Sequence, residues 1–245
     1  MDINSASAEI TRLALWLHTA RGDKPLSSLD TTIREGNSLI GSDFFKGQIN
    51  LAFYDEVEKE RINAFDWKER FPEVFARGGF DAVVGNPSYV KLQNFRKVHA
   101  DMAEFLRSGR QDIPGYTSTQ SGNFDLYLPF IEKGLSILNE HGRLGFIAPS
   151  LWTVNEYGAA LRAMIADGQN LDRWLDFKAH QIFEESRSTR RFSSIRSTRT
   201  IGLRLHSHQM ASWPVIRGLV KKAASPTTTL TMAIAGCSWP GANGH

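Results

Sequence analysis

The sequence predicts an α/β fold built around a parallel sheet, and three observations support this. Residues 80–85 form a short apolar run bounded by glycines, which suits a strand that is buried on both faces. Two later runs, 143–148 and 171–177, also have the composition of strands. Helical patterns at 124–139 and 156–167 lie among these runs, and strands that alternate with helices are typical of parallel sheets with right-handed crossovers.

The segment before this sheet predicts helices and one further strand. Apolar side chains recur at helical spacing over 7–20, which indicates an amphipathic helix. The positions concerned are Ile10, Leu13, Leu17 and Ala20. Residues 31–39 alternate weakly, which predicts a short strand, and the charge-rich stretch 54–77 predicts helix with a break at Pro72.

Two stretches lack a regular pattern. Residues 90–123 contain several turn formers, so we expect a long loop with at most one helix, and long loops in compact domains are often functional. In 186–200, thirteen of the fifteen residues are Ser, Thr or Arg, and no helical or strand period is visible. We therefore divide the chain into a folded domain at 1–185 and a basic tail of low order at 186–245.

Charge is distributed unevenly along the chain. The 245 residues include 29 basic and 26 acidic side chains. Residues 186–245 contain nine Lys and Arg but no Asp or Glu. A shift of this kind indicates either a nucleic-acid-binding arm or a tail whose origin differs from that of the preceding domain.

Composition excludes several classes of protein. No apolar run approaches the roughly 20 residues needed to cross a bilayer, and no signal pattern begins the chain, so we expect a cytoplasmic protein with no membrane partner. The single cysteine, Cys237, rules out an intrachain disulfide and a CxxC metal site. His206 and His208 have no carboxylate nearby in the sequence, so we expect no metal ion.

The sequence Asn86-Pro87-Ser88-Tyr89 directly follows the predicted buried strand. Ligand sites in open parallel sheets form at the C-terminal ends of strands, so the motif lies where a reactive site is expected. The Asn86 side-chain oxygen and the Pro87 carbonyl can accept both hydrogens of an exocyclic amine, which frees the lone pair of a poor nucleophile. Tyr89 offers a flat face on which an extruded base can stack. We assign catalysis to Asn86, Pro87 and Tyr89, with a strand-ending turn without chemistry as the alternative.

Several further segments on both sides of this motif are distinctive. The segments before it are Leu13-Ala14-Leu15-Trp16-Leu17, Gly36-Asn37-Ser38-Leu39, Phe65-Asp66-Trp67 and Phe71-Pro72-Glu73-Val74-Phe75. Those after it are Asp125-Leu126-Tyr127 and Gly142-Arg143-Leu144-Gly145-Phe146-Ile147-Ala148-Pro149. In combination, these segments resemble the large adenine-specific DNA methyltransferases of type IIG and related restriction-modification systems, and the resemblance covers about residues 1–185.

The resemblance implies a Rossmann-like methyltransferase fold, S-adenosylmethionine as methyl donor, and N6 of adenine in double-stranded DNA as acceptor. It places Asp2 at the ribose hydroxyls of the cofactor and Asn37 near the cofactor adenine. The alternative for Asp2 is a disordered terminal residue, and the alternative for Asn37 is a simple loop cap. Ser88 and Lys91 are expected to contact the substrate. Lys91 would contact DNA phosphates, and the alternative is that it belongs to a solvated surface loop.

The chain departs from that family in three places. Ser88 stands where many relatives have a second proline, which makes the turn less rigid. The glycine-rich loop of the family's first cofactor motif should lie before Asp2 and is absent. We therefore expect an incomplete sheet with an open edge, and S-adenosylmethionine binding no tighter than the millimolar range. After residue 185 the family pattern stops, so we expect either a frameshifted tail or a basic DNA-binding arm.

Other functions remain open at this level. The same Asn-Pro-x-Tyr chemistry serves methyltransferases that act on RNA adenine or on protein glutamine. A degenerate remnant that binds nucleic acid through its tail, without turnover, is the non-enzyme alternative. The segment 65–75 and the long loop after Tyr89 favour DNA.

Overall fold

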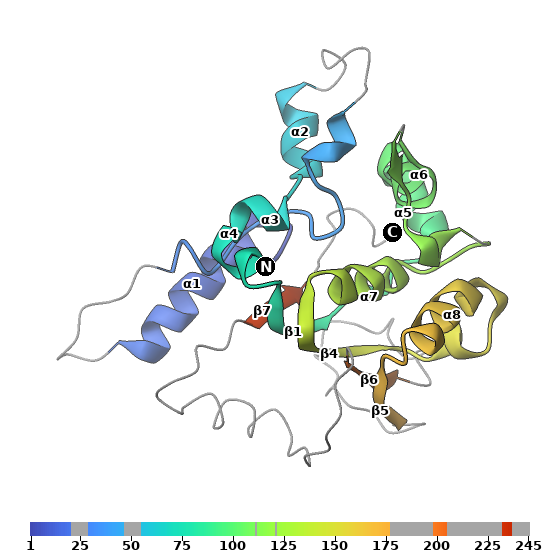
Figure 1. Cartoon of the computed structure of the whole chain (residues 1–245). Coiled ribbons are helices and arrows are strands. Elements are labelled where there is room, and N and C mark those ends of the chain that lie inside the picture. Colours follow the sequence, from blue (N-terminus) through green and yellow to red (C-terminus); the bar gives the residue numbers. More distant parts are fainter. Residues whose placement is uncertain are drawn as a thin grey trace, which may run out of the picture.

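The computed structural model of this chain describes residues 1–20, 29–46, 55–110, 112–120, 122–176, 198–204 and 232–236. Within this part, five strands form one sheet in the order β5-β6-β4-β1-β7 (Figure 1). The central strand β1 (Phe80–Asn86) pairs in parallel with β4 (Leu138–Pro149) on one side and with β7 (Met232–Gly236) on the other. β6 (Thr198–Arg204) runs antiparallel to both β4 and β5 (Leu171–Asp176).

The predicted buried strand is confirmed as β1, which has a neighbour along both edges. Ala82 and Val83 are 6% and 1% exposed, as a strand in the interior of the sheet requires. One expectation needs correction. The sheet is mixed rather than all parallel, because β6 inserts antiparallel between β4 and β5. β7 pairs with the other edge of β1, in keeping with the central position predicted for that strand, and the expected incompleteness of the sheet stays a prediction.

β6 and β7 both come from residues that we predicted to be of low order. β7 is a short apolar run, whereas β6 begins inside the run of Ser, Thr and Arg and has only Ile201-Gly202-Leu203 as an apolar stretch, so its strand signal was masked. The division of the chain at residue 185 stays a prediction. The proposed frameshift point, the His206 and His208 pair and Cys237 lie outside the described residues.

Helices cover the sheet and are confirmed at most of the predicted places (Figure 1). The longer ones are α1 (Ser5–Thr19), α7 (Tyr127–Ser136) and α8 (Ala159–Asp167). The charged stretch before β1 forms α2 (Glu56–Ile62), α3 (Trp67–Arg70) and α4 (Pro72–Ala76), and Pro72 occupies the first turn of α4, where its missing N–H costs nothing. Short 3-10 turns occur at Ser42–Phe45, Thr117–Thr119, Leu151–Thr153 and Glu156–Gly158.

The prediction of a long loop at 90–123 was wrong. This segment contains α5 (Leu92–Val98) and α6 (Ala100–Ser108). They are followed by a hairpin of two short strands, β2 (Gly109–Arg110) and β3 (Ile113–Pro114). Its apolar side chains do recur at helical spacing and are buried: Leu92, Phe95, Met102, Phe105 and Leu106. The break between the two helices at His99 resets the period, so a search for one continuous helix misses both.

The strand predicted at 31–39 is also wrong. The structure has only two isolated parallel bridges there, between Asp2 and Glu35 and between Asn37 and Ala64. Gly36, at φ +146°, lies between the two bridge positions and turns the chain away from a continuous ladder. A β-carbon at Gly36 would lie 2.6 Å from the Phe65 ring, so this close approach also requires glycine.

The core lies on the face of the sheet that carries α7. Seven of the ten α7 residues are buried, and a β-carbon at Gly134 would lie 2.7 Å from Leu144 of β4, so helix and strand are in close contact. At the start of β1, Phe80 is packed edge-on by the rings of Trp67, Phe71 and Phe75. This aromatic cluster fixes β1 against α3 and α4, and so fixes where the strand ends.

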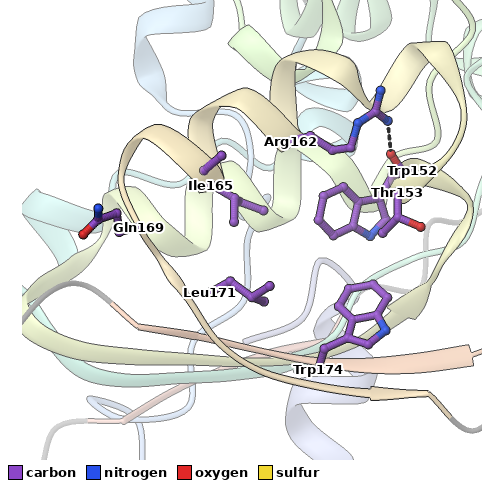
Figure 2. Close-up of a pocket in the computed structure, with 8 residues that line it drawn as sticks. Trp152, Thr153, Arg162, Ile165, Gln169, Leu171 and Trp174 are labelled. Atoms are coloured by element: carbon purple, nitrogen blue, oxygen red, sulfur yellow. Dashed lines mark hydrogen bonds between the residues drawn. The ribbon is translucent and has the colours of Figure 1, made fainter.

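A second aromatic contact joins the turn Leu151–Thr153, which precedes α8, to the outer strand β5. The indoles of Trp152 and Trp174 meet edge to face, with ring centroids 5.8 Å apart. Figure 2 shows them on one side of a pocket in which Ile165 of α8 lies above Leu171 of β5. Arg162 Nη1 donates to the Trp152 carbonyl at 2.5 Å and to the Asn155 carbonyl at 2.7 Å, which holds the turn before α8.

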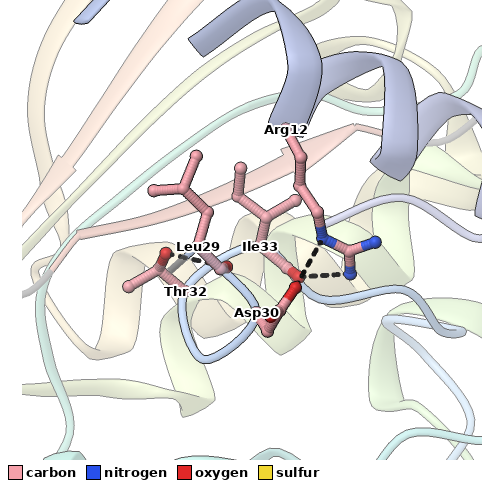
Figure 3. Close-up of polar contacts among 5 residues, drawn as sticks. All are labelled: Arg12, Leu29, Asp30, Thr32 and Ile33. Atoms are coloured by element: carbon pink, nitrogen blue, oxygen red, sulfur yellow. Dashed lines mark hydrogen bonds and ion pairs between the residues drawn. The ribbon is translucent and has the colours of Figure 1, made fainter. Parts of the chain in front are cut away.

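Helix α1 is confirmed, but its apolar stripe does not face the described core. Ile10, Leu13 and Leu17 are 66%, 55% and 81% exposed. The opposite side of the helix is attached through Arg12, which donates to the Ile33 carbonyl at 2.9 Å and lies 3.7 Å from the Asp30 carboxylate (Figure 3). The amphipathic period therefore predicted the helix correctly without identifying which side packs.

We expect Gly79→Ala to destabilise the fold more than Gly78→Ala. Both glycines have positive φ, +127° and +95°, so each alanine should cost about 1–3 kcal/mol in backbone strain. A β-carbon at Gly79 would additionally lie 2.7 Å from the Ile137 carbonyl oxygen, whereas one at Gly78 meets only Asn139 at 3.8 Å. Chemical denaturation of both variants measures the difference. An equal loss of unfolding free energy in the two variants would show that the backbone before β1 can shift to accommodate the added β-carbon.

The described helices include none that is long and apolar enough to cross a membrane. In the same residues, no group of three or more His, Cys, Asp or Glu side chains is arranged to hold a metal ion.

Candidate active site

The motif lies at the C-terminal end of the central strand. Asn86 is the last residue of β1 and is exposed, whereas Pro87 directly after it is buried. Asn86 pairs in register with Gly236 at the end of β7, and the preceding Gly85 pairs with Phe146 of β4. The Asn86 side chain is therefore presented at the edge of the sheet where three parallel strands end, the place at which open α/β sheets bind ligands.

The Tyr89 hydroxyl holds the motif together. It lies 2.5 Å from the Asn86 side-chain oxygen and 2.9 Å from the Ile147 carbonyl oxygen on β4. Since a phenol has one hydrogen, it donates to one of these acceptors at a time. The contact brings Asn86 and Tyr89 together and directs Tyr89 toward the neighbouring strand. Sequence reasoning missed Ile147, because a backbone acceptor carries no residue signature.

Burial controls the protonation of Tyr89. It raises the pKa of Tyr89 from 10.0 to about 12, so the side chain is a neutral donor at physiological pH. A raised folded pKa means that folding favours the neutral form. The resulting stabilisation is complete below pH 10 and is lost as the pH rises toward 12.

We therefore expect Tyr89→Phe to flatten one part of the pH dependence of stability. Between pH 10 and 12 the unmodified protein should lose stability as Tyr89 ionises more readily in the unfolded chain. The phenylalanine variant lacks this group, so its loss over the same range should be smaller. Urea denaturation at a series of pH values measures both curves. Parallel curves would mean that Tyr89 is not buried as described.

The loop after the motif is fastened to the segment before α7. Lys91 and Asp125 form an antiparallel bridge, with Leu126 N–H donating to the Val90 carbonyl and Leu92 N–H to the Phe124 carbonyl, at 2.9 and 3.0 Å. The Lys91 side chain is exposed. Ser88 and Tyr89 are half-buried beside it. The structure thus brings Asn86, Pro87, Ser88, Tyr89 and Lys91 together on one continuous turn.

Asp125 lies next to this turn and was not among the predicted site residues. Burial raises the pKa of Asp125, and the Lys91 charge and a hydrogen bond with Tyr157 oppose that rise. The Tyr157 hydroxyl lies 3.5 Å from the Asp125 carboxylate and 3.3 Å from the hydroxyl of the buried Tyr127. Asp125 and Tyr127 belong to a segment that carried the family resemblance, which was the one signal in the sequence that pointed to them.

Asp2 lies in the bridged N-terminal segment. Its carbonyl accepts from Gly36 N–H at 2.9 Å, and its carboxylate accepts from Asn4 N–H at 2.9 Å, just before α1. The side chain is half-buried. The residue is therefore ordered by its neighbours, and its carboxylate takes part in the turn that leads into the helix.

Asn37 has no exposed surface. Its amide nitrogen donates to the Ile62 carbonyl at 3.2 Å and lies 3.8 Å from the Met102 sulfur, and its oxygen accepts from Leu39 N–H at 3.1 Å. These bonds are those of a loop cap. The contact with Met102 also links this segment to α6, which follows the motif loop. The cofactor roles of Asp2 and Asn37 stay predictions.

Comparison with known proteins gives the motif its context. Residues 1–183 match the profile of the Eco57I restriction-modification methylase family. The type II restriction enzyme and methyltransferase RM.Eco57I of Escherichia coli is 31% identical over 162 residues, which are 65% of this chain and 14% of that protein. The type II methyltransferase M.XhoI of Xanthomonas vasicola is 38% identical over 104 residues, 42% of this chain and 17% of that protein.

M.PaeR7I of Pseudomonas aeruginosa, also a type II methyltransferase, is 37% identical over 99 residues, 40% of this chain and 16% of that protein. The chain thus spans less than a fifth of the length of each of these three relatives. The family match covers the whole of the segment that contains β1, the motif, α7 and β4. By that match, this chain belongs to the Eco57I restriction-modification methylase family.

Proposed function

We propose that this chain is the catalytic segment of a DNA methyltransferase that transfers a methyl group from S-adenosylmethionine to N6 of adenine in double-stranded DNA. The observation that carries the proposal is the position of Asn86: an exposed amide at the end of the central parallel strand, followed at once by a buried proline. The family relationship supports methyl transfer, and the names of the relatives support DNA as substrate.

The motif supplies acceptors and no acid or base. An exocyclic adenine amine carries two hydrogens, and its lone pair is delocalised into the ring. The Asn86 oxygen accepts one hydrogen, and the Pro87 carbonyl accepts the other. Because Pro87 is buried with a fixed φ, the second acceptor stays in place while the base enters. Both bonds strengthen as the nitrogen becomes tetrahedral, so they stabilise the transition state more than the bound base.

Tyr89 gives the base a surface to stack on. Its hydroxyl is anchored to Asn86 and to the Ile147 carbonyl, so the ring has a defined orientation next to the acceptors. An adenine that leaves the duplex loses its stacking, and an aromatic face in the enzyme compensates for that loss. Lys91 is exposed on the same turn, and in this proposal it contacts a phosphate next to the extruded nucleotide.

The cofactor contacts of Asp2 and Asn37 are part of the proposal and rest on the family resemblance. The Asn37 side chain is buried, its amide nitrogen donates to the Ile62 carbonyl, and its oxygen accepts from Leu39 N–H. The Asp2 carboxylate is half-buried and accepts from Asn4 N–H.

A chimaera tests the proposal directly. Residues 1–183 would replace the matching segment of a type II relative, and transfer of a tritiated methyl group would be measured on duplex DNA, RNA and a glutamine-containing peptide. Nucleoside analysis of the product should show N6-methyladenine. If only RNA or only the peptide were methylated, the assignment of DNA as the substrate would be wrong. If the product were N4-methylcytosine, the assignment of adenine as the target base would be wrong.

A further inference from the structure

The helix that follows the motif turn exposes a basic side close to the candidate site. The backbone bridge between Lys91 and Asp125 joins the end of the motif turn to the segment that leads into α7. Lys91 is also the residue that precedes the first turn of α5. It follows Asn86 by five residues, so α5 begins within about 18 Å of the candidate catalytic amide.

α5 separates its side chains into a buried side and an exposed side. Leu92 and Phe95 are buried, and the ring of the buried His99 lies against Phe95 with centroids 5.0 Å apart. The exposed side carries polar side chains that can donate hydrogen bonds: Gln93, Asn94, Arg96 and Lys97. Because the buried side fastens the helix to the core, the polar side keeps a fixed direction.

The charge on this side of α5 is not balanced by neighbouring acids in the sequence. Between Asp81 and Asp101 the chain contains three Lys or Arg residues and no Asp or Glu. Neither Arg96 nor Lys97 forms an ion pair within the described part of the chain. Both lie in the last turn of α5, where cations also stabilise a helix through its dipole. An effect on folding is therefore the competing explanation for them.

We propose that the exposed side of α5, together with Lys91, binds the phosphate backbone of the DNA strand beside the target adenine. The choice of DNA rests on the proposed function, and the charge of this side favours a polyanion. Arg, Lys, Asn and Gln are among the side chains that donate to phosphate oxygens in complexes with DNA. The seven residues of α5 extend about 10 Å, which is the rise of roughly three base pairs.

Phosphate contacts of this kind fix where a duplex lies and carry no sequence information. α5 would hold the strand next to the extruded adenine while Asn86 and Pro87 accept the hydrogens of its amine. The loss of charge from α5 should therefore appear in the affinity for DNA and in its dependence on salt.

The first test uses the whole chain and a short DNA duplex in which one adenine lies opposite an abasic site. An unpaired base leaves the stack at lower cost, so this duplex presents one preferred target. Fluorescence anisotropy gives the dissociation constant at a series of salt concentrations. Replacing Arg96 and Lys97 together by glutamine should reduce the slope of log affinity against log salt concentration by about 2, because two phosphate contacts are lost.

Neutral phosphates then locate the contact on the DNA. A methylphosphonate, which lacks the phosphate charge, replaces one phosphate at a time on either side of the unpaired adenine. With the unmodified chain, replacing a contacted phosphate within about three nucleotides of that adenine should weaken binding about tenfold. With the Arg96→Gln/Lys97→Gln variant, the same replacements should have little effect, because the partner charges are already absent.

Two matched variants separate this contact from general effects of charge and folding. Lys68 and Arg70 are exposed on α3, which packs at the start of β1, the end away from the motif. Replacing both by glutamine removes the same charge and should leave the methylphosphonate effects unchanged. Exchanging the two cations of α5, as Arg96→Lys with Lys97→Arg, keeps the charge and should keep the salt slope.

Two results would overturn the proposal. One is an equal salt slope for the unmodified chain and the Arg96→Gln/Lys97→Gln variant, with a loss of thermal stability alone, which would assign the cations to the helix dipole. The other is methylphosphonate effects that persist in that variant. Equal competition by an RNA duplex of the same sequence would make the choice of DNA wrong. Because these measurements need no methyl transfer, a chimaera that failed to methylate DNA would contradict the proposed function and leave the backbone contact in place.

Discussion

Replacing Asn86 by alanine should reduce methyl transfer by about 10² or more in the chimaera that carries residues 1–183. The substitution removes one of the two acceptors for the target amine. Because that bond strengthens as the nitrogen becomes tetrahedral, the loss should appear in kcat, with little change in the affinity for S-adenosylmethionine. Single-turnover methylation of duplex DNA measures the chemical step separately from product release.

Asn86→Asp is the informative control for that experiment. Aspartate keeps an acceptor of similar size at the end of β1, so it should retain more activity than alanine. Asn86 is exposed, and within the described part of the chain its side-chain oxygen meets the Tyr89 hydroxyl, so neither variant should alter the thermal midpoint by much. If Asn86→Ala kept nearly full turnover, the catalytic assignment of the motif would be wrong.

The central part of the fold was predictable because its signals are local. The apolar run at 80–85 is flanked by glycines and forms β1, and the strong helical period after it forms α7. Pairing between distant segments leaves no such signal. Nothing in residues 232–236 indicates that they pair with β1, because a short apolar run carries no information about its partner.

The same distinction separates the parts of the candidate site. Asn86, Pro87, Ser88 and Tyr89 are contiguous, so a four-residue motif was enough to identify them. The Ile147 carbonyl reaches Tyr89 only because β4 lies beside β1. Asn37 depends in the same way on surroundings that a sequence does not show: its side chain is buried and bonded like a loop cap, and its cofactor role stays a prediction. Burial depends on what α6 covers, and single-sequence reasoning misplaced α6 as a loop.

Replacing Tyr89 by alanine should weaken capture of the target base by roughly 1–3 kcal/mol, a factor of about 5 to 150. Tyr89→Phe keeps the ring and should keep most of that affinity, although Asn86 and the Ile147 carbonyl lose the one donor that they share. The two variants therefore separate stacking from hydrogen bonding. Fluorescence of 2-aminopurine at the target position of duplex DNA, bound to the chimaera, reports base extrusion without requiring turnover. Equal losses in both variants would show that the hydroxyl, and not the ring, holds the base.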